Sequence, residues 1–264
     1  MLGQHFLTDR HILERIVDVL EPSPADEVIE IGAGSGALTR VLADRVGRVI
    51  AIEQDRRLVE QLRKADFARR NVQVVPGDAL QIAWPELMAQ FADREPQWKV
   101  VGNIPYHITS PLIEKALTAP LPLLIVFLVQ AEVANRLAAP PGSKTYGALS
   151  VGVQSLCRVE QVFRVAPGSF QPPPRVHSAV VRLRPRSVPL VDPNEVPRFR
   201  RFVTACFGLR RKQLRNVLSA VTGSETARVT AQLESLGIDV TRRPETLTPE
   251  QFVQLFRGER AGGG

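Results

Sequence analysis

Four consecutive residues in the middle of the chain, Asn103-Ile104-Pro105-Tyr106, combine polar acceptors with an aromatic ring. They follow the apolar run WKVVG, which is typical of a β-strand. The Asn103 side-chain oxygen and a backbone carbonyl at Pro105 or its neighbour could accept hydrogen bonds from both N–H groups of an exocyclic amine, which favours a nucleophilic nitrogen. Pro105 would stiffen this loop, and Tyr106 could stack on a base that is flipped out or single-stranded. A proline turn with a packed tyrosine is the structural alternative.

A glycine-rich segment, EIGAGSGA at residues 30–37, is the second group of residues that could bind a ligand. It follows a predicted strand and opens a predicted helix, so Gly32, Gly34 and Gly36 would let a ligand approach backbone N–H groups at a helix N-terminus. The next strand ends in Glu53, 19 residues beyond Gly34, where a carboxylate can accept both hydroxyls of a ribose. This spacing favours a nucleoside-containing cofactor and leaves NAD and S-adenosylmethionine both open. A glycine turn beside a solvated carboxylate is the alternative without a ligand.

Asp78, in VVPGDAL, ends the third predicted strand. Its carboxylate could accept a hydrogen bond from an adenine amino group. It could equally be the N-cap of a helix over ALQIAWPEL, because Asp is favoured at that position. The spacing is compatible with either role, and both can hold together.

The elements that must position these residues follow one pattern from about residue 27 to residue 130. Short apolar runs alternate with stretches of helical periodicity, and the apolar runs are EVIEIG, RVIAIE, VQVVPGD, WKVVGN and LLIVFLVQ. Strands and helices of these lengths indicate βαβ units on a parallel sheet. Two later runs, CRVEQVFRV and VHSAVVRLR, are predicted to add an antiparallel pair at one edge. The candidate residues therefore come at the ends of successive strands.

The last part of the chain is predicted to contain helices only, with a boundary near residues 186–190. We expect an α/β domain over residues 1–187 and a small all-α domain over residues 188–264. The segment from Arg186 onward holds 13 basic and 8 acidic residues, so it carries +5 of the net charge of +7. A basic balance of this size is compatible with a polyanionic partner.

A basic cluster stands out within this segment, in the run GLRRKQLRN. Its members fall in a little over one helical turn: Arg210, Arg211, Lys212 and Arg215. Such a cluster can neutralise phosphates with little sequence preference. An ordinary solvated basic helix face has the same pattern.

Other features of the composition exclude several classes of protein. No apolar run approaches the ~20 residues that span a bilayer, and the N-terminus lacks a basic segment followed by an apolar core. The chain has only two cysteines, Cys157 and Cys206, too few for a disulfide framework or a cysteine zinc site. We expect a cytoplasmic monomer with reduced thiols and no metal.

Taken in order, the motifs resemble those of the bacterial KsgA family of ribosomal RNA adenine dimethyltransferases, which is related to the Erm resistance methyltransferases. The likeness covers almost the whole chain. It is carried by GQHFLTD, EIGAGSGALT, AIEQD, GDAL, GNIPYHITSP, FLVQAEVANRL, YGALSV, FQPPPRVHSAVVRL and FGLRRKQLRN. The resemblance implies a Rossmann-like class I methyltransferase sheet, mostly parallel with an antiparallel edge, and S-adenosylmethionine as the methyl donor.

The resemblance also implies roles for the N-terminal segment. GQHFL is similar to a segment that folds over the cofactor, so His5 and Leu7 become cofactor contacts. Many family members have Asn where this chain has His5, and we expect His5 to be neutral in the active protein because a positive charge would face a sulfonium. Members usually carry a short basic arm before this segment, whereas this chain starts at Met1. If the arm is absent, we expect weaker RNA contact and cofactor cover.

The remaining roles follow in the same way. The other implied cofactor contacts are Gly32, Gly34, Glu53, Asp78 and Asn103. Asn103, with Pro105 and Tyr106, is implied to lie at the target amine. Phe170, at the head of FQPPP, is similar to an aromatic residue that packs against the target base opposite Tyr106, whereas spacing alone favours a core phenylalanine. The basic cluster is implied to contact RNA phosphates.

The implied function is dimethylation of N6 of two adjacent adenosines near the 3′ end of 16S rRNA, within the 30S ribosomal subunit or its precursor. Two alternatives within the same fold are an Erm-type methyltransferase of large-subunit rRNA and a non-catalytic ribosome-assembly factor. A DNA adenine methyltransferase would need a target-recognition domain that the helical tail hardly resembles. An NAD oxidoreductase would fit the glycine loop and Glu53, but it would explain neither NIPY nor GQHFL.

Overall fold

The computed structural model of the protein describes residues 5–69, 71–89, 98–105 and 108–260. The chain divides into two compact units. The first comprises Met1–Ala134 and Val159–Pro185, and the second comprises Asn135–Arg158 and Arg186–Gly264.

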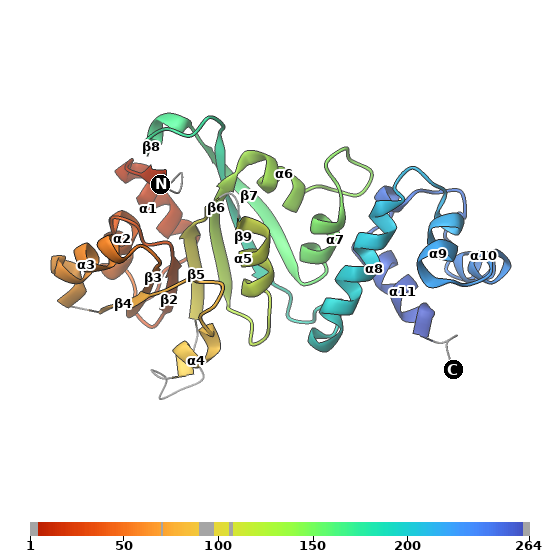
Figure 1. Ribbon diagram of the computed structural model, residues 1–264, viewed down its shortest axis with the longest axis horizontal. Helices are drawn as coiled ribbons and strands as arrows, with labels where there is room; N and C mark the ends of the chain where they lie inside the picture. The colour runs from red at the N-terminus through yellow and green to blue at the C-terminus, as the bar shows by residue number, and fades with distance from the viewer. Residues whose placement is uncertain (1–4, 70, 90–97, 106–107, 261–264) are drawn as a thin grey trace. The chain divides into compact units, whose positions relative to one another are not determined.

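The first unit contains a seven-stranded sheet with the order β4-β3-β2-β5-β6-β9-β7 (Figure 1). Five strands pair in parallel: β2 (Glu27–Ile31), β3 (Arg48–Glu53), β4 (Val72–Pro76), β5 (Trp98–Asn103) and β6 (Leu124–Gln130). β9 (Ser178–Pro185) runs antiparallel to β6, and β7 (Cys157–Val165) forms the edge. The predicted mostly parallel sheet with an antiparallel edge is therefore confirmed.

In the described residues, helices connect consecutive parallel strands, with α1 before the first of these strands and α6 after the last. They are α1 (Arg10–Val19), α2 (Ala37–Ala43), α3 (Arg56–Lys64), α4 (Trp84–Ala89), α5 (Thr109–Ala116) and α6 (Ala131–Leu137). On one face, buried side chains of α1 and α2 pack on those of the central strands, and this cluster includes Leu13, Ile16, Leu42, Val28 and Val101. Burial on both faces explains why the strands are continuous apolar runs.

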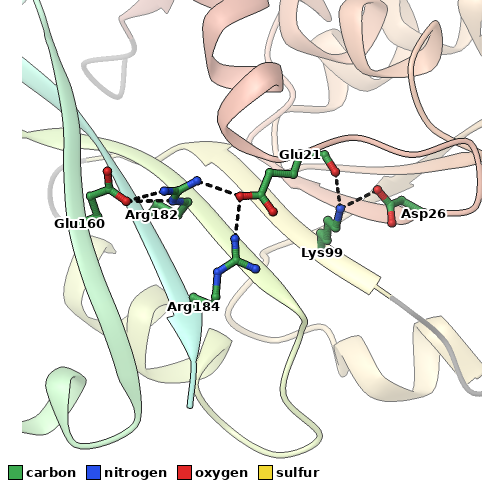
Figure 2. Close-up of polar contacts among 6 residues, drawn as sticks. All are labelled: Glu21, Asp26, Lys99, Glu160, Arg182 and Arg184. Carbon is green, nitrogen blue, oxygen red and sulfur yellow. Dashed lines mark hydrogen bonds and ion pairs between the residues drawn. The ribbon is translucent and has the colours of Figure 1, made fainter. Parts of the chain in front are cut away.

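A network of charged residues fastens the end of α1 to the sheet in this unit, and Figure 2 shows its members. Lys99 of β5 is buried, with 8% of its surface exposed. Its Nζ atom donates to Asp26 Oδ2 at 2.7 Å and to the backbone oxygen of Glu21 at 2.6 Å. The Glu21 carboxylate accepts from Arg182 and Arg184 of β9 at 2.8 and 2.6 Å. Hydrogen bonding and charge from the two arginines, Arg184 first, lower the pKa of Glu21.

The second unit is helical. Its main helices are α7 (Ala148–Gln154), α8 (Val196–Gly208), α9 (Leu214–Thr222), α10 (Thr226–Ser235) and α11 (Pro249–Arg260). Phenylalanine rings form much of its core, with Phe199 and Phe256 edge to face at 5.4 Å between centroids. None of the helices in the described part of the chain is long and apolar enough to cross a membrane.

The second unit includes a segment that the sequence analysis assigned to the first domain. The boundary expected near residues 186–190 matches the start of its second stretch, but residues 135–158 also belong to it. Tyr146 and Val151 of this segment are fully buried in the helical core, and the Tyr146 hydroxyl donates to the backbone oxygen of Leu247 at 2.9 Å. Packing of these side chains, which sequence alternation does not reveal, places the segment in the helical unit.

Candidate active site

The glycine loop lies between β2 and α2 and requires glycine at several positions. Gly32, Gly34 and Gly36 have φ angles of 70°, 58° and 81°, a region that side chains rarely adopt. A Cβ atom on Gly34 would lie 3.1 Å from the Phe6 ring, and one on Gly36 would lie 2.6 Å from the Phe67 ring. The loop is therefore covered closely by the N-terminal segment on one side and supported by Phe67 on the other.

Glu53 ends β3 and holds this loop in place. Its Oε2 atom accepts from the backbone N–H of Gly34 at 2.8 Å, and its Oε1 atom accepts from that of Asp55 at 2.9 Å. The residue is only 4% exposed, so the alternative of a solvated strand-end carboxylate does not fit. Each carboxylate oxygen can accept a further hydrogen bond, which leaves capacity for two hydroxyl groups.

The N-terminal segment reaches the site by pairing with a distant part of the chain. β1 (Phe6–Leu7) lies antiparallel to β8 (Phe170–Gln171), with Leu7 opposite Phe170. The His5 Nδ1 atom lies 2.7 Å from the backbone oxygen of Pro172. Because a carbonyl only accepts, His5 must carry its proton on Nδ1, and a neutral ring then presents an unprotonated Nε2. The structure thus brings His5, Leu7 and Phe170 together.

Asn103 ends β5 and contacts the same N-terminal segment. Its Nδ2 atom donates to the backbone oxygen of His5 at 2.9 Å. This contact uses the amide nitrogen, so the side-chain oxygen keeps its capacity to accept. The Asn103 side chain is therefore oriented by the segment that covers the glycine loop.

The structure describes two of the other three residues of the NIPY motif, Ile104 and Pro105. The Pro105 backbone oxygen accepts from the Ile108 N–H at 3.1 Å and from the Thr109 hydroxyl at 3.3 Å. It is therefore already hydrogen-bonded to residues at the N-terminus of α5. A role for this carbonyl, or for that of Ile104, at a target amine stays a prediction. Tyr106 lies outside the described residues.

Asp78 organises a turn rather than the start of a long helix. Its Oδ1 atom accepts from the Leu80 N–H at 2.8 Å, and its backbone oxygen accepts from two further N–H groups in the turn. The helix that was expected directly after Asp78 begins only at Trp84. Lys115 of α5 donates to the backbone oxygen of Leu80 at 2.8 Å, and so steadies the turn. Asp78 lies two residues beyond the end of β4, which pairs with the strand that carries Glu53.

Phe170 is 4% exposed and belongs to the apolar cluster that covers one face of the sheet. The alternative of a core phenylalanine describes this conformation. A role in packing against a base stays a prediction.

A cavity of about 40 Å³ lies where these elements meet. Residues on its wall include Phe6, Leu7, Glu30, Gly32, Gly34 and Asn103. Four of the predicted cofactor contacts thus surround one cavity, and Glu53 adjoins it through its hydrogen bond to Gly34. His5, Asp78 and Phe170 do not form part of the wall.

Glu30, on β2, is an ionisable residue of this wall that the sequence analysis did not single out. It is 1% exposed, and its Oε2 atom has no hydrogen-bond partner within the described residues. The pKa of its carboxyl group is raised to about 8, chiefly by burial and to a smaller degree by the charge of Glu53, while Thr39 acts in the opposite direction. An acid between two isoleucines of a buried strand, two residues before Gly32, was the available signal.

The basic cluster lies at the turn between α8 and α9, not on a helix as expected. α8 ends at Gly208 and α9 begins at Leu214, so only Arg215 is helical. Arg211 and Lys212 are exposed. The Arg210 guanidinium donates to the backbone oxygen of Lys144 at 3.3 Å, so this side chain is partly engaged within the unit.

No group of three or more His, Cys, Asp or Glu side chains that could hold a metal ion occurs among the described residues.

A profile of the family described as ribosomal RNA adenine dimethylase matches residues 1–258. Ribosomal RNA small subunit methyltransferase A of Geobacter sulfurreducens is 42% identical over 265 residues, which cover 100% of this chain and 95% of that protein. The protein of the same name from Moorella thermoacetica is 42% identical over 260 residues, with 97% of this chain and 90% of that protein covered.

Two solved structures are similar over nearly the whole length. A dimethyladenosine transferase from Plasmodium falciparum has a TM-score of 0.83 and 28% identity, and the alignment covers 97% of this chain and 98% of that one. The 23S rRNA methyltransferase ErmE has a TM-score of 0.72 and 32% identity, with 96% and 98% covered.

Proposed function

The chain belongs to the ribosomal RNA adenine dimethylase family, and we propose that it transfers methyl groups from S-adenosylmethionine to N6 of two adjacent adenosines near the 3′ end of 16S rRNA. Its relatives named ribosomal RNA small subunit methyltransferase A support the choice of small-subunit RNA. The observation that carries the chemistry is the orientation of Asn103 at the cavity by the His5 carbonyl. The proposal places the reaction in the cytoplasm, where bacterial ribosomes assemble.

The residues around the cavity fit S-adenosylmethionine, which supplies the methyl group when bound. Glu53 would hold the ribose hydroxyls, because its oxygens are fixed by two backbone N–H groups and retain acceptor capacity. The glycine loop would let the ligand approach the backbone, since no side chain at Gly32 blocks it. Asp78 would accept from the adenine amino group, and Leu7 would cover the ligand from the N-terminal side.

Asn103 would act on the target amine. The lone pair of an adenine amino nitrogen is delocalised into the ring, so it is a poor nucleophile. When the Asn103 oxygen accepts from one N–H and a carbonyl of the loop accepts from the other, the nitrogen becomes more tetrahedral and its lone pair is freed. These contacts strengthen as the bond to the methyl carbon forms, so they stabilise the transition state more than the ground state. The methylated nitrogen sheds its proton afterwards, so no general base is needed to start the reaction.

Other contacts would position the RNA. The base would stack against Tyr106, and Phe170 would pack against its other face. The exposed cations Arg211 and Lys212 would contact phosphates, with help from Arg210 and Arg215. In this proposal the first unit, which lies within residues 1–187, is catalytic, and residues 188–264 of the second unit form most of the surface that binds the ribosomal subunit.

The test is methyl transfer to defined ribosomal particles. The purified protein is incubated with labelled S-adenosylmethionine and with either 30S or 50S subunits from a bacterial strain that lacks its own enzyme of this kind, and modified positions are mapped by mass spectrometry. Two neighbouring N6,N6-dimethyladenosines in 16S rRNA are expected, with none in 50S particles. An Asn103→Ala variant, in which methyl transfer should be strongly slowed, serves as the control. Methylation of 50S particles alone would support the Erm-type alternative, which the similarity to ErmE keeps open.

A further inference from the structure

The turn that carries Asp78 is held by side chains from two later helices. Trp84 of α4 is 1% exposed, and its Nε1 atom donates to the backbone oxygen of Ala79 at 2.9 Å. Lys115 of α5 donates from Nζ to the backbone oxygen of Leu80 at 2.8 Å. Two consecutive carbonyl groups thus accept from donors that come from separate elements. The conformation of the turn therefore depends on α4 and α5 as well as on its own residues.

The surroundings of Lys115 favour this contact. The residue lies in the last turn of α5, and its Nζ atom is 5.5 Å from the centroid of the Trp84 ring. Partial burial lowers the pKa of its ammonium group, whereas the charge of Asp78 acts in the opposite direction. An unconstrained lysine keeps its ammonium in water, because a charge is costly to desolvate. The Leu80 carbonyl, the Trp84 ring and the Asp78 charge together offset that cost.

The two carbonyl groups are linked to Asp78 through their own peptide groups. The first, which accepts from Trp84, belongs to a peptide group whose N–H donates to Asp78 Oδ1 at 2.8 Å. The second, which accepts from Lys115, belongs to a peptide group whose N–H donates to the backbone oxygen of Asp78 at 2.9 Å. A peptide group is planar and rigid, so fixing its carbonyl also fixes its N–H. Lys115 and Trp84 therefore help to set where the backbone and the carboxylate of Asp78 lie.

We propose that Lys115 is a positioning residue for recognition of the adenine ring of the cofactor, because it holds the turn in which the Asp78 carboxylate meets the adenine amino group. This inference rests on the proposed function, in which Asp78 has that contact. The second carboxylate oxygen, Oδ2, can accept from a ligand while Oδ1 stays bonded within the turn. Such a hydrogen bond needs an acceptor about 3 Å from the amino nitrogen, so a small shift of the turn would lose it. In this role Lys115 acts through the turn and does not contact the cofactor.

The test compares two ligands that differ only at the amino group. They are S-adenosylhomocysteine and its analogue in which purine replaces adenine, and calorimetry of the full-length protein gives both dissociation constants. Wild type should bind S-adenosylhomocysteine about 10- to 100-fold more tightly than the analogue, the ratio expected for one hydrogen bond to a charged acceptor. Lys115→Met keeps an unbranched side chain without an N–H donor, so its ratio should fall to about threefold or less. Its affinity for the analogue should stay within about twofold of wild type, because that ligand lacks the amino group.

Matched variants assign the effect to the contact made by Lys115. Lys115→Arg keeps a charged donor on a long side chain, so its ratio should exceed that of Lys115→Met. Lys64→Met makes the same change at an exposed position in the last turn of α3 and should behave as wild type. Lys115→Gln removes the charge and shortens the side chain, so it repeats the test if Lys115→Met folds poorly. Single-turnover methyl transfer at saturating S-adenosylmethionine should stay within about threefold of wild type in Lys115→Met, because Lys115 lies outside the reacting groups.

The outcomes separate this inference from the proposed function. If Lys115→Met weakens both ligands by the same factor, or leaves the ratio unchanged, the role of Lys115 is overturned while the proposed function stands. A wild-type ratio near one would mean that Asp78 does not recognise the amino group, and the role of Lys115 would be overturned with it. Failure of wild type to bind S-adenosylhomocysteine at all would overturn the proposed function itself.

Discussion

Replacing Glu53 with Gln should disturb the glycine loop and cofactor binding together, because the carboxylate has two backbone partners. Its oxygens accept from the N–H groups of Gly34 and Asp55 at 2.8 and 2.9 Å. The amide of Gln has one oxygen, so its NH2 group must face one of these donors. Losing a hydrogen bond to a charged acceptor costs about 1.5–3 kcal/mol, and a buried N–H without a partner costs about 1–3 kcal/mol. These terms overlap, so we expect a loss of about 2–4 kcal/mol in the free energy of unfolding.

Cofactor affinity should fall at least tenfold, since about 1.4 kcal/mol of binding free energy corresponds to a factor of ten. Urea unfolding followed by circular dichroism gives the first quantity, and calorimetric titration with S-adenosylhomocysteine gives the second. Glu60→Gln, on the exposed face of α3, makes the same chemical change and should alter neither. If Glu53→Gln unfolds at the wild-type urea midpoint and binds within twofold of wild type, Glu53 holds neither the loop nor the ribose.

Four further predictions concern other parts of the molecule. Asn103→Ala should slow methyl transfer by roughly 10²-fold or more and leave RNA affinity within a few-fold; normal transfer in a single-turnover assay would end its catalytic role. Replacing Arg211 and Lys212 with Gln should reduce the slope of log binding constant against log salt concentration for RNA by about one unit for each lost phosphate contact. An unchanged slope would contradict these contacts. Lys99→Met should destabilise the protein to urea by about 3–5 kcal/mol, because it strands a buried carboxylate; an unshifted midpoint would contradict the buried pair. The folded protein binds a proton at Glu30, pKa about 8, that the unfolded chain has lost above pH 4.5, so stability falls as pH rises between these values. The free energy of unfolding in urea should therefore fall less between pH 6 and pH 9 for Glu30→Gln than for the wild type. An equal fall for the two proteins would contradict this prediction.

Much of the first unit could be predicted from sequence because its strands are buried on both faces. Continuous apolar runs and intervening helical periodicity indicate a parallel sheet without knowledge of any contact. The positions of Glu53 and Asp78 at or just beyond strand ends could be predicted in the same way, since the carboxyl ends of parallel strands lie at one edge of the sheet.

The rest depends on contacts that local sequence does not encode. β1 and β8 have two residues each, too few for any periodicity, and only the folded chain places Leu7 opposite Phe170. The segment around Tyr146 resembles the connections before it, but its packing places it in the helical unit. Glu30 could face either side of its strand, and the missing partner that marks it becomes visible only in three dimensions.

The contact between the two ends of the catalytic unit has a consequence for how the protein is made. His5 and Pro172 are 167 positions apart, yet the hydrogen bond between them fixes the segment that orients Asn103. A ribosome synthesises the chain from its N-terminus, so residues 5–7 leave it long before β8 exists. The cover over the glycine loop must wait until about two thirds of the protein has emerged. Chains that stop before β8 would carry the whole glycine loop, Glu53 and Asn103, and still lack the partner that closes the site.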